Sequence, residues 1–264
     1  TDAVWFGFGN NDFHSAGGGV ARFDGVNWQY FTYPQSFPIS DNVLVLAVAP
    51  DGALWAGGGC GVARFDGVTW TPIVTCDDMS SNVYAFAFAS PDVVWIATYF
   101  DLYRLADGEL TTYPGQVSSA MTVGPDDTVW VGLSPIADGG LSHFDGTTWT
   151  TDTEKFPLEY VAALVVDEDG TLWAGGVPGI AHFDGTTWTQ YTEADGLSLG
   201  GDVALRFSPD GVLWAATSQG LTHFDGEVWH LDAVSGGATI HAFSFAPDGS
   251  LWLATSKGAV RFRP

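Results

Sequence analysis

Tyr84 and His241 carry the side chains of this chain that are best suited to proton transfer. They stand at one position of a repeated sequence pattern, which in other copies holds Leu44, Ser119, Ala162 and Val203. An imidazole exchanges a proton near neutral pH, and a phenol donates or accepts a hydrogen bond. A catalytic reading would make the protein a lyase or hydrolase with His241 as the base and Tyr84 or Asp202 assisting.

The short segment that contains Tyr99, Phe100 and Asp101 points to binding instead. Aromatic ring faces stack on the C–H groups of sugars, while carboxylates and amides bond their hydroxyls. The segment therefore predicts a site for a saccharide or another small molecule; the alternative is that its aromatic residues cap the core. Two longer links, at residues 9–18 and 134–140, would instead form a rim for a protein partner.

Sequence signatures of the common hydrolases, metalloproteases and redox sites are absent from the chain. His143, His182 and His223 occupy a repeated position that holds arginine in other copies, so they come from different modules and cannot converge on a metal. We therefore expect no metal and no cofactor, and we assign no catalytic residue. The sequence favours a protein without enzymatic activity.

The elements that would position these residues are indicated by the tryptophans, all twelve of which fall at two positions of the repeat. Five lie three residues after Phe-Asp-Gly, and seven form a second series with gaps of 35 to 50 residues: Trp5, Trp55, Trp95, Trp130, Trp173, Trp214 and Trp252. That period is typical of propeller blades and of some helical repeats. Short apolar runs between Asp-Gly turns, with no ten-residue stretch at helical spacing, exclude the helical repeats.

One module predicts four strands, at residues 43–49, 53–57, 61–65 and 68–74. Asp-Gly between apolar runs is a strong hairpin signal, because glycine accepts the positive φ of primed turns. Each module is therefore expected to be a four-stranded antiparallel meander, the blade of a β-propeller. The predicted fold is all-β, with a single β-propeller domain over residues 1–264.

The first strand of the module appears six times, whereas the second and third appear seven times. Seven blades are expected, the first without its innermost strand and the last without its outermost strand. A six-bladed ring with a spare hairpin would leave more strands unpaired. Either residues upstream of this sequence supply the missing strand, or a neighbouring strand fills the gap by β-addition, which would let the protein assemble with itself.

Arg206 replaces a small residue of the predicted innermost strand, at the position of Ala47, Ala87, Thr122, Val165 and Ser244. A cation that leaves water without a partner costs on the order of several kcal/mol. We therefore expect a salt bridge to a carboxylate such as Asp202. The alternative is an anion bound by Arg206 in the channel.

Charge and hydropathy exclude several classes of partner. The net charge is −23, from 31 acidic residues and eight Lys plus Arg, and ten of the aspartates fall in predicted turns on one face. Such a face repels nucleic acid and anionic lipid, so we expect neither as a partner. The sequence has no run of eighteen apolar residues and no intact signal peptide, so we expect no membrane insertion.

Cys60 and Cys76 are the two cysteines of the chain. They follow the second and the fourth strand of one module, at the same end of the predicted sheet, so their sulfurs can meet. We expect a disulfide and hence an oxidising compartment, with two free thiols as the alternative.

The amino-acid sequence of the repeat resembles that of a known family. Asn42-Val43, Pro50-Asp51-Gly52-Ala53-Leu54-Trp55-Ala56-Gly57 and Gly61-Val62-Ala63-Arg64-Phe65 are similar to the two-component regulator propeller repeat, and every module follows this wording. The resemblance implies a propeller of bacterial sensor ectodomains or secreted proteins, with an extracellular, cell-surface or periplasmic location. In sensor members it implies recognition of saccharides or other small ligands.

Together these observations predict a non-catalytic binding or assembly module. Its site for a small molecule, saccharide or protein partner is expected on the propeller face opposite the Asp-Gly turns. The ligand-binding candidates are Tyr84, Tyr99, Phe100, Asp101, Asp202, Arg206 and His241. The two alternatives are a lyase or hydrolase with a histidine-based site, and a structural protein that self-associates through its incomplete blades.

Overall fold

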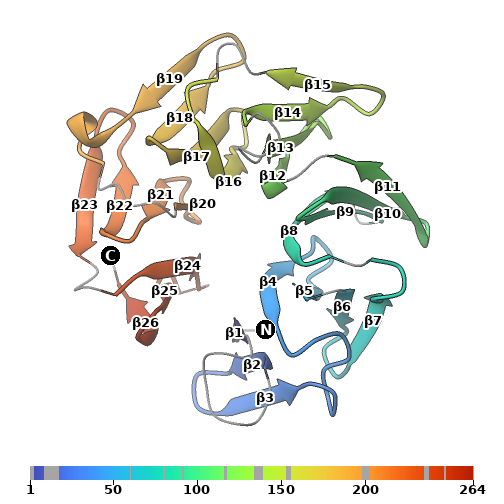
Figure 1. Ribbon diagram of the computed structural model, residues 1–264. Helices are drawn as coiled ribbons and strands as arrows, with labels where there is room; N and C mark the ends of the chain where they lie inside the picture. Colours follow the sequence, from blue (N-terminus) through green and yellow to red (C-terminus); the bar gives the residue numbers. More distant parts are fainter. Residues whose placement is uncertain are drawn as a thin grey trace. The chain divides into compact units, whose positions relative to one another are not determined.

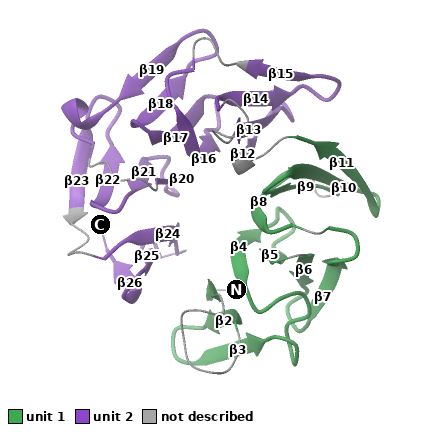
Figure 2. Ribbon diagram, in the orientation of Figure 1, with its two compact units in different colours: residues 1–119 green, residues 120–264 purple. Residues whose placement is uncertain are grey.

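A computed structural model shows a chain made almost entirely of antiparallel sheets (Figure 1). The structure describes residues 3–8, 18–59, 61–79, 81–90, 92–115, 118–133, 139–152, 156–197, 203–234, 238–246 and 248–263. The chain divides into two compact units, Thr1–Ser119 and Ala120–Pro264 (Figure 2). We number the sheets one to seven in chain order.

Unit 1 contains the first three sheets. Their strands are β1 (Val4–Phe8), β2 (Gly19–Phe23) and β3 (Trp28–Thr32); β4 (Val43–Val48), β5 (Leu54–Gly58), β6 (Gly61–Phe65) and β7 (Trp70–Val74); and β8 (Val83–Ser90), β9 (Val93–Thr98), β10 (Asp101–Ala106) and β11 (Glu109–Pro114). Within this unit, β4 contacts both β1 and β8. Each sheet therefore contacts the next through the strand that comes first in the chain.

Unit 2 contains the other four sheets. Their strands are β12 (Ser118–Val123), β13 (Val129–Leu133), β14 (Leu141–Phe144) and β15 (Trp149–Asp152); β16 (Tyr160–Val166), β17 (Leu172–Val177), β18 (Ile180–Phe183) and β19 (Trp188–Tyr191); β20 (Ala204–Phe207), β21 (Leu213–Ala216), β22 (Gly220–Phe224) and β23 (Trp229–Val234); and β24 (Ile240–Phe245), β25 (Leu251–Thr255) and β26 (Gly258–Phe262). A short 3-10 helix, Glu193–Asp195, follows β19.

This succession of sheets is the strand arrangement of a seven-bladed β-propeller, and it confirms the predicted fold class. Each sheet pairs its strands in chain order. Among the described residues, the first sheet lacks the innermost strand and the seventh lacks the outermost, as the repeat count predicted. The fourth strand of the second sheet begins at Trp70, two residues later than predicted, because residues 66–69 form the turn.

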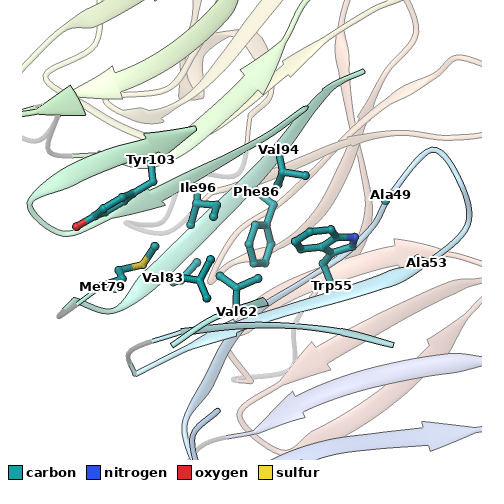
Figure 3. Packing of buried hydrophobic residues seen from close by; sticks show 11 residues of the cluster. Ala49, Ala53, Trp55, Val62, Met79, Val83, Phe86, Val94, Ile96 and Tyr103 are labelled. Carbon is teal, nitrogen blue, oxygen red and sulfur yellow. The ribbon is translucent and has the colours of Figure 1, made fainter. Parts of the chain in front are cut away.

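Aromatic rings of one sheet pack against the next sheet of the same unit. In unit 1 the Trp55 ring lies 6.2 Å from Phe86 and 6.0 Å from Phe88 of the following sheet (Figure 3). In unit 2 the Trp173 ring lies 5.4 Å from Phe224. The repeated tryptophans therefore join successive sheets within each unit, because their large rings bury apolar surface on both sides of the contact.

A glycine at the end of a second strand leaves room for a valine of the next sheet. A Cβ atom placed on Gly57 would lie 2.5 Å from Val83 Cγ1, closer than packed atoms approach. The same close approach joins Gly132 to Val161 in unit 2. Successive sheets are thus interlocked by a small residue that faces a β-branched one.

Candidate functional site

Each sheet has two chemically different ends. Tight turns join the first strand to the second and the third to the fourth, and we call this the turn end. The opposite end, where the second strand leads into the third and the first strand begins, is the link end. The pairing registers, such as Leu54 with Phe65 and Gly58 with Gly61, define the two ends in the second sheet.

At the turn end, the aspartates bond their own turns. Asp184 Oδ1 accepts hydrogen bonds of 2.8 Å from the backbone N–H groups of both Thr186 and Thr187. The Thr186 hydroxyl and then these two N–H groups hold the pKa of Asp184 well below its usual range. Asp51 accepts from Ala53 N–H and pairs with Arg64 Nη2 at 2.7 Å. These carboxylates are therefore turn formers, as the sequence predicted.

The turns do not all have the primed Asp-Gly geometry that the sequence predicted. In the third sheet, Asp107 and Gly108 both have positive φ, 52° and 78°, as a primed turn requires. In the second sheet only the glycine of the Asp-Gly pair has positive φ, 102° at Gly67, while Asp66 accepts N–H bonds from the turn. In the fifth sheet the N–H bonds go to Asp167 rather than to the predicted Asp169.

The repeated arginines and histidines lie opposite the tryptophans of the second strands. The cross-strand pairs are Trp5–Arg22, Trp55–Arg64, Trp95–Arg104, Trp130–His143, Trp173–His182, Trp214–His223 and Trp252–Arg261. The His182 ring lies 4.2 Å from Trp173, and burial lowers its pKa, which favours the neutral imidazole. The Arg22 guanidinium lies 5.8 Å above Trp5. The three histidines lie in three different sheets, each opposite its own tryptophan.

At the link end, the first strands carry β-bulges at the position that the sequence singled out. The pairing of the first strand with the second skips one residue in four sheets, namely Leu44, Tyr84, Ala162 and His241. A bulge leaves its extra residue unpaired and turns its side chain in a new direction. Leu44 and His241 are exposed, and Tyr84 is half-buried. These bulges place side chains at the link end without a role in strand pairing.

Val203 does not share this position. It is buried, and a Cβ atom on Gly175 would lie 2.7 Å from its Cγ1. This is the packing that Val83 makes against Gly57, so Val203 is the counterpart of Val83 and not of Tyr84. The pairing of β20 with β21 runs without a register shift, which explains why the sequence alignment was displaced by one residue there.

The third sheet carries four of the predicted site residues at its link end. Val83 pairs with Thr98; Tyr84 lies one residue further into the sheet on β8, and Tyr99 lies one residue beyond the pair, after β9. Tyr99 and Phe100 are 43% and 60% exposed, and their rings meet at 4.9 Å in a T-shaped contact. Loop aromatics that cap the core would be covered, so these exposures favour the binding alternative.

Hydrogen bonds fix this link. The Thr98 hydroxyl donates to the carbonyl oxygen of Asp101 at 2.8 Å and accepts from its N–H at 3.1 Å. Asp101 Oδ1 accepts a 3.2 Å bond from Gly115 N–H. Asn82, which sequence reasoning missed, donates its Nδ2 to the Tyr84 hydroxyl at 3.3 Å. The repeated Asn-Val phrase before each of these first strands, at Asn42 and Asn82, was the signal that pointed to it.

The remaining candidates belong to unit 2 or lie outside the described residues. Arg206 is exposed on β20, and its Nη1 donates to the carbonyl oxygen of Leu205 at 2.8 Å. The surrounding protein desolvates the guanidinium and lowers its pKa, although the side chain still reaches solvent. No carboxylate of the described residues forms an ion pair with Arg206. Asp202, the predicted partner, lies outside the described residues.

A pair of histidines in the sixth sheet also escaped the sequence analysis. His223 Nδ1 lies 2.6 Å from Asp232 Oδ2, and His230 Nε2 lies 2.6 Å from Asp225 Oδ2. The two imidazole rings stack at 5.1 Å because His223 and His230 are cross-strand partners on β22 and β23. Only the strand register, which sequence spacing does not reveal, places them side by side.

Cys76 is disulfide-bonded. Cys60, the other cysteine of the chain, lies outside the described residues. Across the described parts of the chain, no three His, Cys, Asp or Glu side chains gather in a way that would hold a metal ion. No helix among those residues has the length and apolarity needed to cross a membrane.

No protein-family model and no curated protein matches the sequence. Among solved structures, the extracellular domain of a hybrid two-component system from B. thetaiotaomicron is similar with a TM-score of 0.77 at 16% identity; the match covers 100% of this chain and 38% of that one. A catalytically inactive virginiamycin B lyase from Staphylococcus aureus, solved with quinupristin, gives a TM-score of 0.77 at 14% identity over 98% of both chains. PorZ, a surface component of the type-IX secretion system of Porphyromonas gingivalis, gives 0.67 at 14% identity over 93% of this chain and 44% of its own.

These identities establish the fold alone. The chain shares a seven-bladed propeller architecture with extracellular domains of two-component systems. This agrees with the resemblance of its repeat sequence to the two-component regulator propeller repeat. It spans about a third of the length of those domains, 38% and 32%. The same architecture serves a lyase and a secretion-system component, so the function has to be argued from the residues of the site.

Proposed function

We propose that this chain is a non-catalytic binding module that recognises a saccharide or a similar polyhydroxylated small molecule at the link end of the third sheet. The observation that carries the proposal is the exposed pair Tyr99 and Phe100, whose rings contact each other at the same end of the third sheet as the bulged Tyr84. Two perpendicular rings offer one face and one edge to a ligand, which suits the C–H surface of a sugar ring.

Polar groups lie at the same end of the third sheet. The Tyr84 hydroxyl and the Asn82 amide are already oriented toward each other at 3.3 Å, so little side-chain freedom remains to be lost on binding. Asp101 places a carboxylate at this link, and its Oδ1 accepts from Gly115 N–H. Small-ligand sites commonly combine apolar contact area with a few such fixed polar atoms.

The proposal includes an extracellular, cell-surface or periplasmic location. The disulfide at Cys76 supports it, because such bonds persist in oxidising compartments. The extracellular domains among the structural neighbours support it as well, at the level of fold.

A glycan-array screen of the intact chain, followed by calorimetry on the best ligand, tests this function. Phe100→Ala should weaken binding about tenfold, which corresponds to roughly 1.4 kcal/mol. Tyr30→Ala is the matched control, because Tyr30 is also 60% exposed in unit 1 but lies on β3. Equal affinity of the two variants, or no glycan bound by the wild-type chain, would refute the proposal.

The same ligands separate binding from catalysis. The bulged and exposed His241 is the group on which the lyase or hydrolase alternative depends. A bound ligand recovered unchanged after long incubation supports a pure binder. Turnover that disappears in a folded His241→Ala variant would overturn the non-catalytic part of the proposal.

A further inference from the structure

The link between the second and third strands of the third sheet is anchored like the link of the sixth sheet. Thr98 Oγ1 accepts from Asp101 N–H at 3.1 Å, and Thr217 Oγ1 accepts from Gln219 N–H at 3.1 Å. Two residues follow the threonine in both links. They are a serine and a glutamine in the sixth sheet but Tyr99-Phe100 in the third. The anchor itself therefore does not require aromatic rings.

Asp101, which follows these rings, stands where the other six modules have glycine. The position lies three residues before the arginine or histidine that faces the second-strand tryptophan. The glycines at this position are Gly19, Gly61, Gly140, Gly179, Gly220 and Gly258. A Cβ atom would lie 2.1 Å from the Phe31 carbonyl oxygen in the first sheet and 2.9 Å from that of Val74 in the second. The third module alone has a side chain here, and that side chain is a carboxylate.

The charge of Asp101 is not balanced by a basic side chain of the described residues. Its Oδ1 accepts from Gly115 N–H, a neutral donor that fixes the carboxylate without removing its charge. Unit 1 has no lysine, and its arginines are Arg22, Arg64 and Arg104. Arg104 is the nearest in sequence, but it lies three positions along β10 and so faces the opposite side of the sheet. Across the described parts of the chain, no ion pair includes Asp101.

A cation is the one kind of ligand group that both features of this link attract. The face of an aromatic ring carries partial negative charge and draws an ammonium group to it, and a carboxylate attracts the same group. The rings of Tyr99 and Phe100 meet at 89° and are 43% and 60% exposed, so their faces point in two directions. A sugar ring can therefore stack on one face while an ammonium group contacts the other.

We propose that the Tyr99-Phe100-Asp101 link selects ligands that carry a protonated amine, so that the saccharide bound by this chain is an amino sugar rather than a neutral or acidic one. The aromatic rings supply contact area and cation–π attraction, and Asp101 supplies the charge that distinguishes an ammonium group from an acetamide. This inference rests on the proposed function and adds to it the charge of the ligand.

The probes are a chitosan tetrasaccharide and its fully N-acetylated counterpart, which share a sugar backbone but differ in charge. Calorimetry with the intact chain at about pH 5.5, where amines are protonated, should show the amine form binding about tenfold more tightly. This preference should shrink as the salt concentration rises, because ions screen exposed charges.

Two single variants separate the contributions of charge and ring. Asp101→Asn can still accept from Gly115 N–H, but it should weaken binding of the amine form roughly threefold to fivefold and leave the acetylated form nearly unchanged. Glu109→Gln is the matched control, because it removes one negative charge from the exposed turn end of the same sheet and should change neither affinity. Phe100→Leu keeps an apolar side chain without a ring face and should also reduce the preference.

A triple variant, Tyr99→Ser with Phe100→Gln and Asp101→Gly, tests the location by giving the third sheet the link of the sixth. It should fold, because the sixth sheet uses the same threonine anchor, and it should lose the preference for the amine form. A preference that persists in this variant would refute the inference. So would equal affinity of the wild-type chain for both tetrasaccharides, or a neutral glycan bound more tightly than every amine form, although the proposed function would then stand. Binding of no glycan at all would refute both.

Discussion

The turn end and the link end of the sheets differ in how many of their polar side chains already form hydrogen bonds within the fold. At the turn end, Asp145 and Asp184 each accept two backbone N–H bonds and two threonine hydroxyl bonds from their own turn. At the link end of the third sheet, Tyr99 and Phe100 remain exposed. The carboxylates of these turns therefore build the fold, whereas the link end of the third sheet exposes uncharged aromatic rings.

A large effect is expected where the link end of the second sheet packs against the third sheet. Gly57→Ala should destabilise the protein by about 3 kcal/mol, because the new Cβ would lie 2.5 Å from Val83 Cγ1 and 2.9 Å from Phe86. Gly67→Ala at the turn end should cost only about 1 kcal/mol, since φ is +102° but nothing lies within 4 Å. Denaturant unfolding measures both, and the reverse order would contradict the packing described here.

A smaller effect is expected from the turn carboxylates, and it depends on pH. Folding lowers the pKa of Asp184 below its ordinary 3.8, so the stabilisation is present above that value and is lost as pH falls toward the folded-state pKa. Asp184→Ala should lower the Tm at pH 7 and flatten its fall below about pH 4. Asp184→Asn, which can still accept the N–H bonds, should recover part of the Tm. The Tm of all three proteins, measured as the pH is lowered, tests this role of Asp184. An equally steep fall of the Tm in wild type and Asp184→Ala would contradict it.

Exposed side chains at the link end should be removable at almost no cost in stability. Phe100→Ala is expected to change the free energy of unfolding by less than about 0.5 kcal/mol, as is usual for surface positions. Trp55→Ala, at a buried ring that joins two sheets, should cost about 3 to 5 kcal/mol. If Phe100→Ala proved equally damaging, the ring would be part of the core and the contrast between the two ends would fail.

The smallest effect concerns Arg206, which fits neither end. Its guanidinium is desolvated, and its Nη1 donates a hydrogen bond to the Leu205 carbonyl oxygen. Replacing it by the alanine found at Ala47 and Ala87 should raise the Tm slightly, because this removes a desolvated cation that has no ion-pair partner among the described residues. A Tm that falls in Arg206→Ala would instead show that the arginine stabilises the sheet.

The features that are local in sequence were predictable. The tryptophan period, the Asp-Gly turns and the alternation of strands depend on neighbouring residues, and they led to the propeller, its seven modules and the placement of the three histidines in different modules. The placement of Tyr84, Tyr99 and Phe100 at one end of the third sheet also followed, because they lie at the ends of adjacent strands.

Register and packing between sheets lay beyond that reasoning. The bulge at Tyr84 and the unshifted pairing of β20 with β21 decide which side chain packs against the neighbouring sheet, because side chains alternate with a period of two and one skipped residue reverses them. The stacking of His223 on His230 depends on the same register. The sequence determined the modules because turn and strand preferences are local, whereas only the tertiary structure decided which residues stay exposed, since exposure depends on the neighbouring strand and sheet.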